Sequence, residues 1–254
     1  MESRDVYDNR RMAWAYAFDR PPVHPHIIRA LRTRLGLDAR VGRALDVGCG
    51  AGVSTAALET VARATVGLEP APAMLTHCRT VAPGAAFVVG RAERLPFTAG
   101  SFDLVTAAGS LNYVDLPLFL AGLVRVLAPE GILAIYDFSA GRRLLDDNRL
   151  DAWYAAFERR YPPKPGYDLD VRALPFDRFG LRLDRLDALE VAVPMTFASY
   201  LRYVMSESGV QTAISQGAEE AGIRRWCEST LAGVLDDTPR DVLFDAYVGY
   251  VARG

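Results

Sequence analysis

RALDVGCGAGV, residues Arg43–Val53, is the stretch of sequence that decides the fold. Ala44–Val47 is a short apolar run interrupted by Asp46, and this pattern is typical of a buried strand. Three glycines follow at alternate positions, namely Gly48, Gly50 and Gly52. A helix is then predicted over 54–61. Because glycine has no Cβ, the chain can turn tightly here and a ligand can lie directly against backbone N–H groups. The stretch therefore predicts a nucleotide-like cofactor at the C-terminal edge of a parallel sheet.

The same kind of turn occurs in dinucleotide-binding folds, so the motifs downstream of it decide between cofactors. A second strand is predicted over Ala64–Leu68, and it ends at Glu69-Pro70. Glu69 follows the turn by about 20 residues, where an acidic side chain can accept hydrogen bonds from both ribose hydroxyls of an adenosine. Three further motifs follow in order: Gly90–Phe97, Ser101–Val105 and Pro129–Leu133.

Taken together, these ordered motifs resemble the class I S-adenosylmethionine-dependent methyltransferases, in the branch that acts mainly on small molecules. The resemblance covers roughly Val41–Phe138. It implies S-adenosyl-L-methionine as the cofactor and S-adenosyl-L-homocysteine as the product. It also implies an α/β fold, a Rossmann-like three-layer sandwich with a seven-stranded, mostly parallel sheet, an antiparallel last strand and a helical N-terminal lid. Spacing alone would leave a NAD enzyme open, and the ordered set of motifs disfavours it.

We expect a single methyltransferase domain over residues 1–254. Residues 1–40 would supply N-terminal helices and the lid, 41–139 the cofactor-binding core, and 140–254 the substrate-side helices and the last strands. A plainer interpretation of the N-terminal segment also stays open, in which a helix packs Trp14 and Phe18 on the core.

Apolar periodicity and helix breakers predict the remaining elements. Helices are expected over 23–37, 70–81, 116–127, 146–161, 197–205 and 218–235. Strands are expected over 85–89, 103–107, 132–138, within 181–194 and over 241–253, and a rigid connector over 162–166.

Composition excludes several classes of function. Half of the 254 residues are hydrophobic and 24% are charged, as in a soluble globular enzyme. The formal net charge is −2 and arginines are interleaved with acidic residues, which argues against a nucleic-acid partner. No apolar run approaches the roughly 20 residues of a membrane span, and the N-terminus lacks the apolar core of a signal peptide. The three cysteines have no metal-ligand spacing, so we expect reduced thiols in a cytoplasm and no metal. We also expect a monomer or homodimer.

The resemblance implies a set of cofactor-binding residues at the ends of successive strands. They are Asp46, Gly48, Cys49, Gly50, Gly52, Val53, Glu69, Pro70, Met74, Arg91, Ala92, Glu93, Ala108 and Leu111. Met74 is expected to flank the adenine, with core packing as the alternative. Ala92 and Glu93 are expected to contact the edge of the adenine ring, although a plain surface loop stays open for Glu93. Arg91 departs from the family, which commonly has an acidic residue at that position.

Methyl transfer from a sulfonium is an in-line displacement, in which the protein positions the nucleophile and excludes water. The candidate catalytic residues are His24, Asn112, Tyr113 and Asp137, and the candidate substrate-binding residues are Tyr16, Arg20, Arg142 and Arg143. A base matters only where the acceptor must lose a proton. A phenol or hydroxyl acceptor would favour His24, His26 or Asp137 as that base, whereas a carboxylate acceptor would need an arginine instead.

The function that these patterns favour is methyl transfer to an O-, N- or C-nucleophile of a small molecule, of the natural-product or carboxylate type. One alternative is a macromolecule methyltransferase, which the charge disfavours. Another is a protein that binds S-adenosylmethionine in a regulatory or non-methylating role.

Overall fold

The computed structural model describes residues 9–145, 147–163 and 169–254. The first residue of the helix expected over 146–161 and the end of the connector expected over 162–166 lie outside the described residues.

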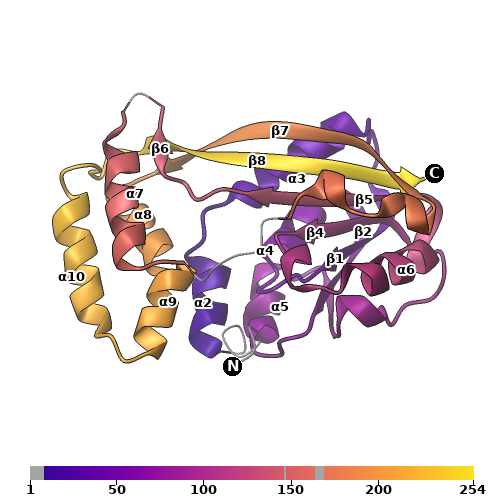
Figure 1. Cartoon of the computed structure of the whole chain (residues 1–254), viewed down its shortest axis with the longest axis horizontal. Coiled ribbons are helices and arrows are strands. Elements are labelled where there is room, and N and C mark those ends of the chain that lie inside the picture. Colours follow the sequence, from indigo (N-terminus) through magenta and orange to yellow (C-terminus); the bar gives the residue numbers. More distant parts are fainter. Residues whose placement is uncertain (1–8, 146, 164–168) are drawn as a thin grey trace.

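The described residues form one sheet around which the helices are arranged (Figure 1). Its strands are β1 (Val41–Val47), β2 (Ala62–Glu69), β3 (Ala86–Val89), β4 (Phe102–Ala108), β5 (Leu127–Phe138), β6 (Arg143–Leu144), β7 (Leu181–Met195) and β8 (Arg240–Arg253). Strands β3, β2, β1, β4 and β5 are neighbours in that order and run parallel. Strand β8 lies antiparallel between β5 and β7. The mostly parallel sheet with an antiparallel last strand is therefore confirmed.

Strand β6 was not expected, and it continues β5 along the same edge of β8. Leu243 of β8 pairs with Arg143 of β6 on one side and with Ala192 of β7 on the other. The chain therefore leaves the sheet after Phe138 and rejoins it for two residues. This return carries Arg142 and Arg143 away from the edge where β5 ends.

The helices are α2 (Arg10–Phe18), α3 (Val23–Arg34), α4 (Val53–Leu58), α5 (Cys78–Val81), α6 (Leu116–Val126), α7 (Arg149–Arg160), α8 (Phe197–Met205), α9 (Ser208–Ser215) and α10 (Glu220–Leu231). Successive strand residues point to opposite faces of a sheet. On β1, Ala44 packs with α3 and α4, whereas Leu45 packs with α6. The two buried clusters on opposite faces make the three layers that the resemblance implied.

Helices α7 to α10 form a group next to α2, at the end of the sheet where β6 and the ends of β7 and β8 lie (Figure 1). The four side chains expected to point inward from α7 are all buried: Leu150, Trp153, Tyr154 and Phe157. Helix α9 was not predicted. Among the described residues, no helix is long and apolar enough to cross a bilayer.

Two local expectations are wrong. Trp14 and Phe18 of α2 do not pack on the core, since 55% and 41% of their surfaces are exposed, and Met12 is buried instead. The helix expected over 70–81 is reduced to a 3₁₀ turn, η1 (Met74–His77), and the short α5. Pro72 disfavours a helical backbone at the residue before it, so a regular helix does not begin at residue 70.

Candidate cofactor and acceptor site

The glycine-rich turn after β1 packs against the turn after β4. Gly48 has φ +69°, and a Cβ on it would lie 2.4 Å from Cβ of Ser110. Ser110 Oγ donates a hydrogen bond of 2.6 Å to the carbonyl of Val47. Only glycine fits so close an approach, and it leaves the backbone of the turn open to the space above the sheet.

Asp46 lies beneath this turn and is completely buried. Its carboxylate accepts hydrogen bonds from Ser54 (2.6 Å), Thr55 (2.7 Å) and Thr106 (2.9 Å). Burial raises the pKa of Asp46, and the three hydroxyl donors oppose that rise. These bonds join β1, β4 and the start of α4, so Asp46 fixes the turn from below and does not itself line the cavity.

Glu69 ends β2 with its carboxylate beside the same turn. Oε2 accepts the N–H of Gly50 at 3.0 Å, and Oε1 accepts the N–H of Ala71 at 2.9 Å. Burial raises the pKa of Glu69, and the two N–H donors oppose the rise. A carboxylate oxygen can accept a second hydrogen bond, so both oxygens can still receive a hydroxyl. The adenosine ribose carries two such hydroxyls, and Glu69 therefore fits the cofactor that the resemblance implies.

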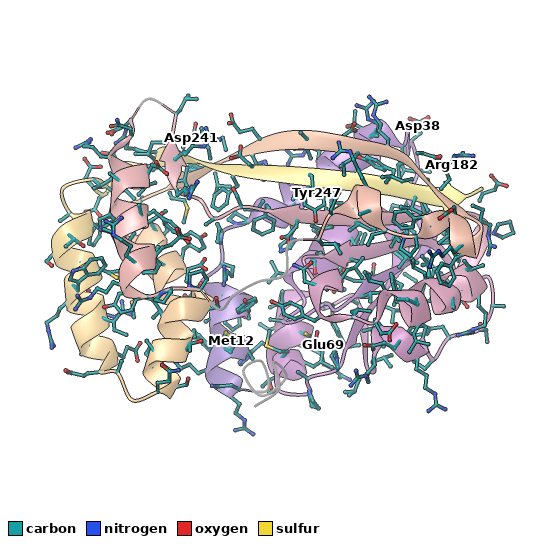
Figure 2. All side chains as sticks on the ribbon, viewed as in Figure 1. Met12, Asp38, Glu69, Arg182, Asp241 and Tyr247 are labelled. Carbon is teal, nitrogen blue, oxygen red and sulfur yellow. The ribbon has the colours of Figure 1, made fainter. Side chains whose placement is uncertain are left out.

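The next strand ends supply the wall where the adenine is expected. Ala92 is nearly buried at the start of η2 (Ala92–Arg94), and Glu93 forms an ion pair with Arg91 at 3.3 Å. Met74 is 2% exposed and packs with Met12 and Ala51 while also lining the cavity. Met74 thus packs in a buried cluster, and its contact with the adenine stays a prediction that its place in the cavity wall allows. Figure 2 labels Met12 of α2 and Glu69 at the end of β2.

A cavity of about 720 Å³ opens above the C-terminal ends of the parallel strands. Pockets for small molecules span roughly 300–1,000 Å³, so this one has room for a nucleoside cofactor and part of an acceptor. Most of the predicted site residues line it: Tyr16, Arg20, His24, Gly48, Cys49, Gly50, Val53, Glu69, Pro70, Met74, Arg91, Ala92, Glu93, Ala108, Asn112, Tyr113 and Asp137.

Four predicted residues besides Asp46 are not brought to the cavity wall: Gly52, Leu111, Arg142 and Arg143. Gly52 precedes α4 as its N-cap with φ +88°, and Leu111 is buried in the core. Arg142 pairs with Asp151 at 3.4 Å, and Arg143 pairs with Glu190 at 3.0 Å and Asp245 at 2.7 Å. The two arginines are thus held outside by β6, and the expectation that they bind substrate is corrected.

Arg20 crosses from the turn between α2 and α3 to the turn between α8 and α9. It forms an ion pair with Glu207 at 2.9 Å and donates to the carbonyl of Ser206 at 3.3 Å. Its guanidinium also lies 4.5 Å from the ring centre of Tyr16. Glu207 and Ser208 line the cavity, and sequence reasoning missed both because no motif marks that turn.

Asp137 and His24 line the cavity where β5 ends. Asp137 accepts the N–H of Phe138 at 2.8 Å, and burial raises its pKa. Gly109 has φ +59°, and a Cβ there would lie 3.0 Å from Oδ1 of Asp137, so this turn closes over the carboxylate. Nδ1 of His24 lies 3.0 Å from the hydroxyl of Tyr136. Burial and the nearby Arg20 cation lower the pKa of His24 to about 4.

The described residues contain no group of three or more His, Cys, Asp or Glu side chains that could hold a metal ion. His26 of α3, the other histidine weighed as a base, is not among the residues that line the cavity.

Comparisons with known proteins agree with this geometry. Residues 45–135 match a family described as a methyltransferase domain. A phthiotriol/phenolphthiotriol dimycocerosates methyltransferase of Mycobacterium leprae is 36% identical over an alignment of 159 residues, and the match covers 57% of this chain and 57% of that protein. A demethylmenaquinone methyltransferase of Beutenbergia cavernae is 38% identical over 105 residues, 41% of this chain and 44% of that protein. The aligned part thus spans about half the length of these relatives.

A solved structure from Anaeromyxobacter dehalogenans, provisionally assigned as a type II methyltransferase, has the same fold. Its TM-score is 0.69, its sequence identity is 24%, and the match covers 92% of this chain and 97% of that one. The glycine turn, the acidic residue that ends β2, the order of the strands and the match over residues 45–135 together support a class I S-adenosylmethionine-dependent methyltransferase.

Proposed function

We propose that this protein transfers a methyl group from S-adenosylmethionine to a hydroxyl group of a small organic acceptor. The observation that carries the proposal is a single cavity lined at once by Gly50, Glu69 and the partly buried carboxylate of Asp137. Gly50 and Glu69 have the geometry to hold an adenosine, and Asp137 can accept a proton at the place where the acceptor would meet the cofactor.

The cofactor side of the cavity would act through shape and hydrogen bonding. Glu69 would accept both ribose hydroxyls, the backbone of the glycine turn would lie against the cofactor, and Met74 would flank the adenine. When bound, S-adenosylmethionine supplies an electrophilic methyl group, and its loss leaves S-adenosylhomocysteine. The remaining wall would hold the acceptor in line and exclude water.

Asp137 is the group that we assign as general base. In the transfer, the acceptor oxygen forms a bond to the methyl carbon, the carbon–sulfur bond breaks, and the hydroxyl proton passes to Asp137. Burial raises the pKa of Asp137, which makes its carboxylate a better proton acceptor near neutral pH than an exposed one. Asn112 and Tyr113 would then serve to position the acceptor.

The cation at the acceptor side supports a hydroxyl acceptor over a carboxylate acceptor. Arg20 is already paired with Glu207, so its charge is compensated within the protein. A carboxylate acceptor would compete with Glu207 for Arg20 and would lie in the same cavity as Asp137. A neutral hydroxyl avoids both costs.

Two relatives are named for small acceptors, phthiotriol dimycocerosates and demethylmenaquinone, and they support a small-molecule acceptor here. We also propose that residues 41–139 hold the cofactor while 1–40 and 140–254 shape the acceptor side within one domain. A cytoplasmic location, as a monomer or homodimer without a nucleic-acid partner, is part of the same proposal.

The first experiment is calorimetric titration with S-adenosylmethionine, with NAD as the control ligand. Binding of S-adenosylmethionine alone is expected, and binding of NAD alone would overturn the cofactor assignment. A panel of phenols, aliphatic alcohols and carboxylic acids is then scanned for acceptor-dependent release of S-adenosylhomocysteine. Turnover with hydroxyl compounds is expected. Cofactor binding without turnover on any acceptor would favour the non-methylating role.

The variant Asp137→Asn tests the base. It is expected to retain cofactor binding and to lose most of the turnover with a hydroxyl acceptor. Asp245→Asn is the matched control, because Asp245 is an exposed carboxylate paired with Arg143 outside the cavity. Equal turnover in Asp137→Asn and the wild type would remove the base assignment.

A further inference from the structure

His24 and Tyr136 form a hydrogen-bonded pair that joins the start of α3 to β5. Nδ1 of His24 lies 3.0 Å from the hydroxyl oxygen of Tyr136. The imidazole also packs edge to face against Tyr136 and Phe138, with ring centres 5.8 Å and 5.2 Å apart. These contacts fix the plane of the imidazole, so only its protonation pattern is left to be determined.

The direction of this hydrogen bond follows from the surroundings of Tyr136. The side chain is completely buried, and burial together with the carboxylates of Asp46 and Asp137 raises its pKa, so the hydroxyl keeps its proton. Within the described part of the chain, the Tyr136 hydroxyl has no hydrogen-bond acceptor other than Nδ1 of His24. The opposite arrangement, with Nδ1–H donating, would leave a buried hydroxyl hydrogen without a partner, which is costly.

Burial of the imidazole, and secondly the nearby Arg20 cation, lower the pKa of His24 and so disfavour a second proton on the ring. A neutral imidazole that accepts at Nδ1 carries its hydrogen on Nε2. The ring lines the cavity, and no hydrogen bond to Nε2 is recorded within the described residues. Nε2 is therefore the nitrogen available to a ligand.

We propose that Tyr136 is a positioning residue that holds His24 in its Nε2–H tautomer, so that His24 offers a hydrogen-bond donor to an oxygen of the acceptor molecule. The expectation that His24 is a base is thereby reversed, because Nε2–H has no lone pair with which to take a proton. The statement about the acceptor rests on the proposed methyltransferase function, whereas the tautomer does not. The geometry favours acceptors that carry a carbonyl, ether or second hydroxyl oxygen near the methylated group over acceptors that carry an ammonium there.

The tautomer can be measured directly by ¹⁵N NMR of protein labelled at histidine. The chain has three histidines, so comparison with His26→Asn and His77→Asn assigns the signals of His24. At neutral pH the expected pattern is an unprotonated Nδ1 and a protonated Nε2. A protonated Nδ1 would overturn the proposal. In Tyr136→Phe, which keeps the ring but removes the donor, His24 is expected to shift towards a mixture of tautomers, and an unchanged pattern would contradict the role of Tyr136.

Kinetics provides the second arm, once a hydroxyl acceptor is known. Tyr136→Phe is expected to raise the KM for an oxygen-bearing acceptor roughly threefold to tenfold, the range for one lost hydrogen bond, while the affinity for S-adenosylmethionine stays the same. Unchanged acceptor KM would refute the contact between His24 and the acceptor. If the NMR pattern is as expected but no acceptor is methylated, the proposed function fails and the assignment of Tyr136 stands.

Discussion

Oε2 of Glu69 accepts the backbone N–H of Gly50 at 3.0 Å, and this bond ties the end of β2 to the turn after β1. Glu69 ends β2, Gly50 lies in the turn that follows the neighbouring parallel strand β1, and both residues line the cavity. Glu69 therefore has two roles at once: it holds the shape of the turn, and it offers its remaining lone pairs to a ligand. A change at either residue is expected to weaken cofactor binding, either by altering the shape of the turn or by removing hydrogen bonds to the cofactor. Different variants can separate these two causes.

Glu69→Ala is expected to weaken binding of S-adenosylmethionine on the order of 10- to 100-fold, the range for loss of hydrogen bonds to a charged group. Because burial raises the pKa of Glu69, wild-type affinity should also begin to fall on acidification at a higher pH than for an ordinary glutamate. Calorimetry over a pH series measures both effects. Glu190→Ala, at an exposed glutamate paired with Arg143, is the control, and equal losses in the two variants would remove Glu69 from the site.

Gly50→Ala is expected to fold with a small loss of stability and to lose cofactor affinity by tenfold or more. The φ of Gly50 is +52°, and a Cβ would find only ordinary contact, with Met74 at 3.5 Å. Gly100→Ala is a matched control, because its φ is +63° and nothing lies within 4 Å of a Cβ there. Both variants carry about 1–2 kcal/mol of left-handed backbone strain. Only Gly50→Ala should change the affinity for S-adenosylmethionine measured by calorimetry. Normal binding by this variant would show that the cofactor does not lie against the glycine turn.

The sequence predicts those parts of the fold and the site whose structure is determined by the residues of one short stretch. The turn of Gly48 and Gly50 shows where a strand ends and a ligand can approach, and Glu69 follows at the distance that one strand–helix–strand unit requires. The same local logic predicted α7, because four apolar side chains at helical spacing must share one face.

What could not be predicted depends on contacts between distant parts of the chain. Glu207 lies 187 residues from Arg20, and nothing around it in sequence indicates that it meets a cavity. Arg142 follows β5 closely in sequence, yet the return of the chain along β8 places it outside. Tyr136, the hydrogen-bond partner of His24, is 112 residues away, and its position in an apolar strand gives no sign that its hydroxyl meets a histidine. Such roles are set by tertiary packing.

The ion pair between Arg20 and Glu207 is expected to stabilise the protein through both partners together. The side chains are 20% and 17% exposed, so the charges are partly removed from water. A double-mutant cycle with Arg20→Met and Glu207→Gln, followed by urea unfolding, should give a coupling free energy of about 1–3 kcal/mol. The pair Arg143–Glu190, with side chains 42% and 50% exposed, should give a clearly smaller coupling because water screens both charges. Equal coupling in both cycles would contradict the difference in burial.

Because of His24, the folded protein is expected to become less stable as the pH falls below 6.5, the ordinary pKa of a histidine side chain. Burial and Arg20 lower its pKa in the folded state to about 4, so between these values the unfolded chain binds a proton that the folded chain does not. The contribution is fully present above pH 6.5, declines on acidification and is lost by about pH 4, for a total of at most about 3 kcal/mol. Urea unfolding of the wild type and of His24→Asn between pH 4 and 6.5 measures this contribution to the free energy of unfolding. Asparagine can still accept the hydrogen bond from Tyr136, and the contributions of other titrating groups cancel in the difference between the two proteins. The difference in unfolding free energy between the wild type and the variant should shrink as the pH falls. A difference that does not change with pH would show that the pKa of His24 is the same in the folded and the unfolded protein.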